Sequence, residues 1–216
     1  MDPRLAHYFP PLGVRVASGR LELRGIGTDE VLALIDVVRD GVHDPAQMPF
    51  SFPWTDASRE EIPRNYLQWW WRELATWTPE AWNLNLCVLW DGEVVGVQSV
   101  ATRDFPTVRY GETGSWLGRR FHGRGIGTAM RQAMCAFLFD ELDFEFITSS
   151  AVLDNAASLR ISEKLGYVDN GVDWSVPRKE RVSVRRLLLL PEDFRRGDPI
   201  TVEGADALRR FLGVRV

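Results

Sequence analysis

The chain has 216 residues, of which 45% are hydrophobic and 26% are charged, and these proportions are ordinary for a soluble globular protein. This length leaves room for one substantial hydrophobic core and at most two domains. The formal net charge of −4 argues against a nucleic-acid partner, because proteins that bind nucleic acid usually present a basic surface. No apolar run approaches the length of a membrane span and the N-terminus lacks an apolar signal core, so we expect a cytoplasmic protein with no membrane partner.

Two residue types are informative by their number. The two cysteines, Cys87 and Cys135, fall within apolar patterns and provide neither a disulfide framework nor the spacing of a zinc site. We therefore expect buried thiols and no bound metal. Nine tryptophans are many for this length, and exposed ones could form the face of a homodimer.

The first part of the chain predicts an irregular segment, a strand and a helix. Residues 1–14 are rich in proline and predict irregular structure, whereas residues 15–24 alternate as a strand does. Thr28 is placed to cap a helix that runs to Arg39, because acidic residues in its first turn suit the helix dipole. Gly41 is expected to end this helix.

A second helix is expected to begin near the capping box of Ser58 and Glu61 and to reach about residue 76. Apolar side chains at helical spacing predict that it packs against a sheet; they are Leu67, Trp70, Trp71 and Leu74. Between the two helices, residues 44–54 form a loop with three prolines, a methionine and three aromatic side chains. This loop either packs over an edge of the core or lines a substrate pocket.

The middle of the chain predicts three strands. Residues 84–90 and 94–102 read as a hairpin, because Asp91 and Gly92 favour a type I′ turn between them. Residues 107–117 predict the third strand. A glycine-rich segment follows, and after it apolar residues recur at helical spacing: Ile126, Met130, Ala133 and Phe137.

The last part of the chain predicts a strand, a helix and two more strands. Residues 144–152 read as a short buried strand, Asp154 or Asn155 as the cap of the next helix, and Gly166 as its end. The final strands and a short helix in the tail are expected at 167–175, 181–190 and 204–212.

The glycine-rich segment, residues 118–130, lies where the third strand passes into a helix. Arg119, Arg120 and Arg124 accompany its glycines, and free N–H groups at a helix N-terminus favour phosphate binding. A Walker loop would need Gly-Lys-Ser/Thr, which is missing. A dinucleotide fingerprint would need glycine or alanine at Thr128, so both nucleotide motifs are poorly matched.

The segment instead resembles the acyl-CoA pyrophosphate loop of the GNAT N-acyltransferase superfamily, with His122, Gly125 and Gly127 at its three fixed positions. His122 departs from the usual arginine or glutamine. Residues 154–167 resemble the family's Asn-x-x-Ser…Lys-Leu-Gly-Phe/Tyr segment, and residues 18–24 resemble the opening strand of the branch that acetylates ribosomal-protein N-termini.

From about residue 15 to 190 the resemblance implies an α/β GNAT fold. This fold is a mixed, mostly antiparallel central sheet of about seven strands flanked by helices, with splayed central strands that hold acyl-CoA. We expect one such domain over residues 1–216, with an irregular N-terminal segment and a C-terminal tail at 191–216.

The resemblance implies an enzyme that moves an acyl group from CoA to a primary amine by direct attack. The donor would be acetyl-CoA or another short acyl-CoA, and arginines near the site would suit succinyl-CoA. The acceptor would be a protein N-terminus, a lysine or a small-molecule amine such as an antibiotic or metabolite. A non-catalytic CoA-binding regulatory module is the alternative of another class.

Glu112 is the candidate base, because residues 110–117 match the Glu-x-Gly-x-Trp-Leu pattern of the ribosomal branch. An amine must lose a proton before it attacks, so a base assists. The alternative is an outward-facing carboxylate in an ion pair. Many members carry a tyrosine acid at the position of Ser162, so the resemblance implies Ser158 as the donor to the departing thiolate.

The resemblance also assigns the groups that hold the donor. Backbone N–H groups of Trp116 and Leu117 would meet the pantetheine and the thioester carbonyl, and Asn155 would bond the pantetheine amide. The residues expected to bind the cofactor are Trp116, Leu117, His122, Gly123, Arg124, Gly125, Ile126, Gly127, Thr128, Asn155 and Ser158.

Overall fold

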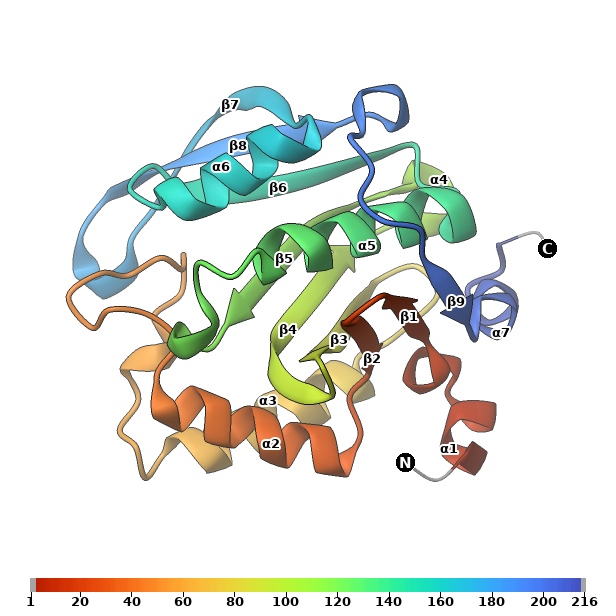
Figure 1. Ribbon diagram of the computed structural model, residues 1–216, viewed down its shortest axis with the longest axis horizontal. Helices are drawn as coiled ribbons and strands as arrows, with labels where there is room; N and C mark the ends of the chain where they lie inside the picture. Colours follow the sequence, from red (N-terminus) through yellow and green to blue (C-terminus); the bar gives the residue numbers. More distant parts are fainter. Residues whose placement is uncertain (1–2, 215–216) are drawn as a thin grey trace.

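The computed structural model describes residues 3–214 and contains a nine-stranded sheet with helices on both faces (Figure 1). The strands lie in the order β7-β8-β6-β5-β4-β3-β2-β1-β9. Neighbouring strands are antiparallel except for the parallel pair β5–β6. The strands are β1 (Arg15–Ser18), β2 (Leu21–Gly25), β3 (Trp82–Trp90), β4 (Glu93–Thr102), β5 (Tyr110–Leu117), β6 (Phe146–Val152), β7 (Val168–Ser175), β8 (Val182–Leu189) and β9 (Thr201–Glu203).

Residues 3–214 also form seven α-helices and five short 3₁₀ helices. The α-helices are α1 (Pro3–Tyr8), α2 (Thr28–Asp40), α3 (Ile62–Ala75), α4 (Phe105–Val108), α5 (Ile126–Leu142), α6 (Ala156–Leu165) and α7 (Ala205–Phe211). The 3₁₀ helices are η1 (Pro10–Gly13), η2 (Trp54–Asp56), η3 (Arg119–Phe121), η4 (Pro177–Lys179) and η5 (Pro191–Asp193). Helix α5 packs on one face of the sheet, while α2 and α3 lie together on the other (Figure 1).

Strand β3 shows how the sequence builds these two layers. Leu86 and Val88 belong to the large core beneath α5, whereas Cys87 and Leu89 belong to a second core beneath α2 and α3. Successive side chains of a strand point to opposite faces, so a nearly continuous apolar run buries both faces at once.

The parallel strands β5 and β6 separate at one end and leave an opening in the sheet. Strand β5 passes into α5, which returns the chain to β6 beside β5, and such crossovers join parallel neighbours. The pairing of β5 with β6 reaches Thr113 and Ser149. Beyond that pair, β5 continues beside β4 to Leu117, while β6 continues beside β8 to Val152. The two strands therefore part at their carboxyl ends, where open α/β sheets bind ligands.

Several predicted elements differ from the structure at the edges of the sheet. Of the predicted irregular segment, residues 1 and 2 lie outside the described residues, and residues 3–14 are mostly helical, since they contain α1 and η1. Residues 15–24 are not one strand, because Gly19 adopts a positive φ of 55° and turns the chain into the β1–β2 hairpin. The tail adds β9 next to β1, so the sheet has nine strands rather than about seven.

Local differences also have simple causes. Strand β5 begins at Tyr110 rather than residue 107, because α4 occupies the preceding residues. Gly27 rather than Thr28 caps α2, and its N–H donates to the Glu30 carboxylate at 3.0 Å. On α3, Trp71 was predicted to pack against the sheet together with Leu67, Trp70 and Leu74, but it is 56% exposed, so the prediction is wrong for this residue.

The confirmed features include the two buried free cysteines, the β3–β4 turn at Asp91 and Gly92, both with positive φ, and Gly166 as the left-handed cap of α6. The capping box of Ser58 and Glu61 is present just before α3. Within residues 3–214, no helix has the length and apolar character needed to cross a bilayer.

Candidate active site

A cleft of roughly 890 Å³, open to solvent, occupies the gap between the parted strands. Strands β5 and β6 supply most of its wall, the start of α6 closes one end, and the aromatic loop before α3 covers part of the opposite side. The lining residues are Pro49, Phe50, Ser51, Asn83, Ser99, Ala101, Glu112, Thr113, Gly114, Ser115, Arg131, Ser149, Ser150, Ala151, Val152, Asn155 and Ser158. Glu112 and Arg131 are the charged residues of this lining.

The glycine-rich loop leads from β5 into α5 and has the conformation that its sequence predicts. Gly123 and Gly125 have φ values of 75° and 82°, which glycine adopts without strain, and Gly125 is the N-cap of α5. A Cβ at either position would meet no atom within 4 Å, so the backbone is open to an approaching ligand. At Gly127 a Cβ would lie 2.9 Å from Ile161 Cδ1, which explains the third glycine by packing against α6.

The charged side chains of this loop have different partners. Arg119 pairs with Asp44 at 3.5 Å, and Arg120 pairs with Glu93 at 2.8 Å. Arg124 is exposed and lies over the Phe121 ring at 5.7 Å.

His122 bonds back to the preceding strand, since its Nε2 lies 3.0 Å from the Leu117 carbonyl oxygen. This contact ties the loop to the end of β5. Its assignment to the donor remains a prediction, as do those of Gly123, Arg124, Gly125, Ile126, Gly127 and Thr128.

Glu112 lies on β5 with an exposed side chain, and its Oε1 accepts a hydrogen bond of 2.5 Å from Ser150 Oγ of β6. Among the ion pairs of the described residues none includes Glu112, which argues against its alternative role as the partner of a surface cation. The carboxylate is thus held at the cleft by a neutral hydroxyl and keeps lone pairs for another ligand.

Helix α6 presents the second predicted group. The Asn155 side chain caps the helix by accepting from the Ser158 N–H at 3.1 Å, so its NH₂ group remains free to donate. Ser158 is half-buried at the cleft, while Ser162 is buried one turn further on. Both hydroxyls contact Arg131, so the tyrosine-to-serine difference at Ser162 leaves space that an arginine fills.

Arg131 is the site residue that the sequence predictions missed. It is the single basic residue of α5, it is only 5% exposed, and it reaches the cleft from beneath. The available signal was a lone basic residue among the apolar residues Ile126, Met130, Met134 and Phe137 of one helix, because buried charges are rare without a partner.

The aromatic loop both packs on the core and lines the cleft. Phe50 and Trp54 pack against the second core, with the Trp54 ring 5.7 Å from that of Trp116. The connection between β7 and β8 holds the loop from outside: Arg178 makes two hydrogen bonds to the Asp56 carboxylate, at 2.6 and 2.7 Å, and Ser175 Oγ donates to the Ser51 carbonyl. A segment far away in sequence thus holds the loop that lines one side of the cleft.

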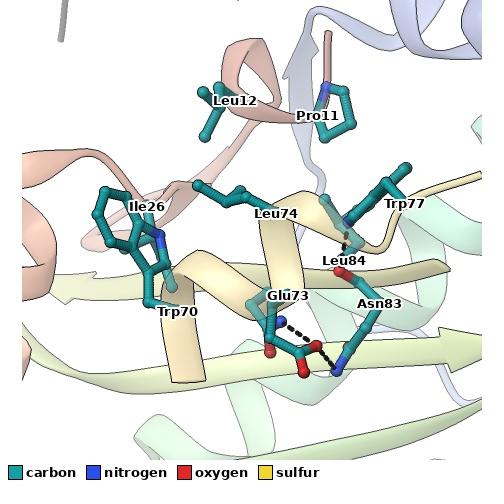
Figure 2. Close-up of a pocket in the computed structure, with 10 residues that line it drawn as sticks. Pro11, Leu12, Ile26, Trp70, Glu73, Leu74, Trp77, Asn83 and Leu84 are labelled. Atoms are coloured by element: carbon teal, nitrogen blue, oxygen red, sulfur yellow. Dashed lines mark hydrogen bonds between the residues drawn. The ribbon is translucent and has the colours of Figure 1, made fainter. Parts of the chain in front are cut away.

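A second, narrower pocket lies between α3, β3 and η1 (Figure 2). Its carboxylate, Glu73, already accepts from Asn83 Nδ2 at 2.6 Å and from Asn85 Nδ2 at 3.4 Å, and Trp77 Nε1 donates to the Asn83 carbonyl. These contacts fix α3 on the sheet. We assign this pocket to packing, because it lacks a phosphate-binding loop and a free titratable group.

Together these features form an α/β site in which a parallel strand pair parts over a glycine-rich helix N-terminus, and polar groups converge at the parting. Comparison with known proteins agrees. The Acetyltransferase (GNAT) domain family matches residues 20–168, more than half of the chain. The chain therefore belongs to the GNAT acetyltransferase family.

Individual relatives are more distant. YdaF of Bacillus subtilis, named as a candidate ribosomal N-acetyltransferase, is 30% identical over 84 residues, which are 39% of this chain and 45% of that protein. The match thus spans less than half of this curated relative.

Solved structures extend the likeness of fold. RimJ of Mycobacterium smegmatis in complex with CoA-disulfide has a TM-score of 0.71 at 17% identity, with 92% of each chain covered. An acetyl transferase from Salmonella typhimurium, titled as modifying the N-terminal serine of a 50S ribosomal subunit protein, has a TM-score of 0.65 at 20% identity over 80% of this chain and 96% of that one.

Proposed function

We propose that residues 1–216 act as one acetyl-CoA-dependent N-acetyltransferase whose acceptor is the α-amine of a protein N-terminus. The observation that carries this proposal is the cleft between β5 and β6, which brings Glu112, Asn155 and Ser158 together at the carboxyl end of the parallel pair. A structural neighbour in complex with coenzyme A supports the donor, and the ribosomal names of several relatives support the acceptor.

The donor would lie along α5 with its pyrophosphate at residues 123–128. Free backbone N–H groups and the positive end of the helix dipole suit that anion. Beyond Thr113 the edge of β5 is not paired with β6, so backbone groups of Trp116 and Leu117 would serve the pantetheine and the thioester carbonyl. Asn155 would donate its free NH₂ group to the pantetheine.

Glu112 would accept the proton that the attacking amine loses. An α-amine titrates near 8 and a lysine amine near 10.4, so a protein N-terminus needs less assistance from a weak base. The 2.5 Å bond from Ser150 orients the carboxylate toward the cleft. Substitution of Glu112 tests its role as the proton acceptor.

A small-molecule amine is the second candidate acceptor. The clamp of Arg178 on Asp56 and of Ser175 on Ser51 narrows the acceptor side of the cleft, which suits a compact ligand. Succinyl-CoA is the second candidate donor. A non-catalytic CoA-binding module is the alternative of another class. Such a module would not need the Glu112 carboxylate, which lies at the cleft outside every ion pair of the described residues.

An acceptor screen tests the proposal. The chain is incubated with acetyl-CoA and three acceptor sets: peptides with free N-termini, the same peptides blocked at the N-terminus but carrying lysine, and small polyamines. Mass spectrometry should detect acetylation of the free N-termini. Acetylation confined to polyamines would replace the acceptor, and CoA release without any acceptor preference would contradict the proposal.

A further inference from the structure

The guanidinium of Arg131 is buried at the cleft without an anion. Its Nη1 donates to Ser162 Oγ at 2.9 Å, and its Nη2 lies 3.4 Å from both Ser115 Oγ and Ser158 Oγ. Its Nε, equally buried, has no hydrogen-bond partner. Among residues 3–214, three neutral hydroxyls are therefore the only groups that accept hydrogen bonds from it.

The residues around Arg131 supply no compensating charge. No ion pair of the described chain includes this arginine. Its titratable neighbours are neutral near pH 7, because burial raises the pKa of Tyr167 well above its ordinary value and raises that of Cys135 to about 11. A buried, unpaired charge is costly, so a negative charge is expected to come from the ligand.

The alternation of side chains along β5 shows on which side of the cleft the Arg131 guanidinium lies. Ser115 contacts Arg131 and therefore faces α5, whereas Glu112 is three residues earlier and faces the opposite side of the strand. Ala101, which pairs with Glu112, and Asn83, which pairs with Ala101, lie on that same opposite face beneath α3. The anionic and the cationic side chain thus lie toward opposite faces of the strand, although both line the same cleft.

We infer that Arg131 is a positioning residue that stabilises the departing CoA thiolate through Ser158. This inference rests on the proposed acyl transfer. In that reaction the amine nitrogen bonds to the thioester carbon, its proton passes to Glu112, and the carbon–sulfur bond breaks with both electrons on sulfur. Negative charge therefore develops on the side of β5 where Arg131 lies and where the helix that binds CoA lies.

The hydrogen bonds of Ser158 and Ser162 support donation from Ser158 to the sulfur. Ser162 accepts from Arg131 and donates to the Ser158 carbonyl at 3.2 Å, so its proton is used. Ser158 Oγ accepts from Arg131, and within the described residues its own proton has no acceptor. An acceptor of hydrogen bonds that is polarised by a cation donates more strongly in turn. The Ser158 hydroxyl is thus prepared to donate to a thiolate.

The first test is Arg131→Met, which keeps the length of the side chain and removes the charge, beside Arg131→Lys and the exposed control Arg210→Met on α7. We expect kcat with acetyl-CoA to fall roughly 100-fold in Arg131→Met, as when one charge-stabilising donor is removed. KM for acetyl-CoA should change little, Arg131→Lys should recover part of kcat, and Arg210→Met should match the wild type. Ligand-free Arg131→Met should unfold at an equal or higher temperature, because an unpaired buried charge is gone.

The second test reads the thiolate directly. The wild type should bind CoA more tightly than desulfo-CoA, in which hydrogen replaces the thiol, and bound CoA should show the ultraviolet absorbance of a thiolate at neutral pH. A free thiol titrates near 8.5, so this absorbance reports stabilisation by the protein. In Arg131→Met the preference and the absorbance should both disappear, although CoA still binds. A merely structural arginine would not affect either readout.

Three outcomes would overturn the inference. Unchanged kcat in Arg131→Met would remove Arg131 from the reaction. A lower unfolding temperature without ligand, with the CoA preference intact, would make it a structural residue. Loss of transfer from succinyl-CoA alone would mean that the guanidinium binds a carboxylate of the acyl group. The absence of CoA binding to the wild type would instead contradict the proposed function.

Discussion

The two faces of strand β5 differ in charge, burial and neighbours. On the face toward α2 and α3, Glu112 is exposed and accepts one hydrogen bond from the Ser150 hydroxyl of β6. On the face toward α5, Ser115 meets a guanidinium that is 5% exposed and surrounded by serines. A period of two along one strand thus places an anion and a cation on opposite sides of a single opening.

This difference makes one side of the cleft anionic and the other side cationic. In the proposed reaction, the proton that the amine loses would be attracted to the Glu112 carboxylate, and the negative charge that develops on sulfur would be attracted to the Arg131 guanidinium. Both groups are fixed before any substrate arrives, which is how fixed dipoles and charges lower a barrier without reorganisation. The sheet, which parts only beyond Thr113, provides the passage between the two sides.

The largest effect should follow from closing the cofactor entrance on the α5 side. Gly125→Val places a branched side chain at a φ of 82° in the loop, so CoA binding, measured by calorimetry, should be lost. Gly92→Val is the matched control, because Gly92 has a φ of 80° and equally open surroundings but lies in the β3–β4 turn. Both variants should lose comparable thermal stability, and only Gly125→Val should lose CoA. Normal CoA binding by Gly125→Val would refute the loop assignment.

Glu112→Gln removes the anion from the other face. Turnover at neutral pH should fall roughly 10- to 100-fold while CoA affinity is unchanged, since a positioned base contributes about this much. The deficit should shrink as pH rises above about 8, where an α-amine is already deprotonated. Steady-state rates from pH 6 to 10, each beside the exposed control Glu145→Gln, provide the measurement. A deficit that is independent of pH would assign Glu112 to binding rather than to proton removal.

A smaller effect is expected from removing the contact of Arg178 with the aromatic loop. Arg178→Ala releases Asp56 and the Pro45 carbonyl, so KM for the acceptor should rise several-fold while KM for acetyl-CoA stays constant. Arg196→Ala, which breaks an equivalent two-bond pair with Asp140 at a distance from the cleft, is the control. Global stability should change little in either, because exposed ion pairs contribute little. Equal effects on both KM values would show that the loop does not distinguish the two sides.

The smallest effect concerns the thiols, which report on the two cores separately. Burial raises the pKa of Cys87 to about 12 and that of Cys135 to about 11, so neither thiol forms appreciable thiolate at pH 8. A colourimetric thiol reagent should therefore react with neither in the native protein and with both in denaturant, where thiols titrate near 8.5. Rapid reaction of Cys135 alone would mean that the core beneath α5 opens locally.

Much of this arrangement was predictable from the sequence, because it depends on local patterns. The glycines at 123 and 125 predicted the loop, Asn155 predicted the cap of α6, and the spacing of apolar residues predicted α5. The order of the central elements then followed from their resemblance to the GNAT family.

What could not be predicted depends on contacts between distant residues. The pairing of β9 with β1 joins residues far apart in sequence, and a three-residue strand has no periodicity to detect. The environment of Arg131 is assembled from β5, α5 and α6, so only the folded chain brings the three serines around it. Likewise, the contact of His122 with the Leu117 carbonyl depends on how the loop folds back on β5, so the sequence did not predict it, and the contact of His122 with the donor remains a prediction.

The most direct test of the account is thermal unfolding with and without saturating CoA, in the wild type and in Gly125→Val. A ligand at about 100 times its dissociation constant stabilises the native state by about 2.7 kcal/mol, or roughly 5–10 °C for a protein of this size. We predict such a shift for the wild type and none for the variant. No shift in the wild type would contradict the claim that the parted strands form an acyl-CoA site.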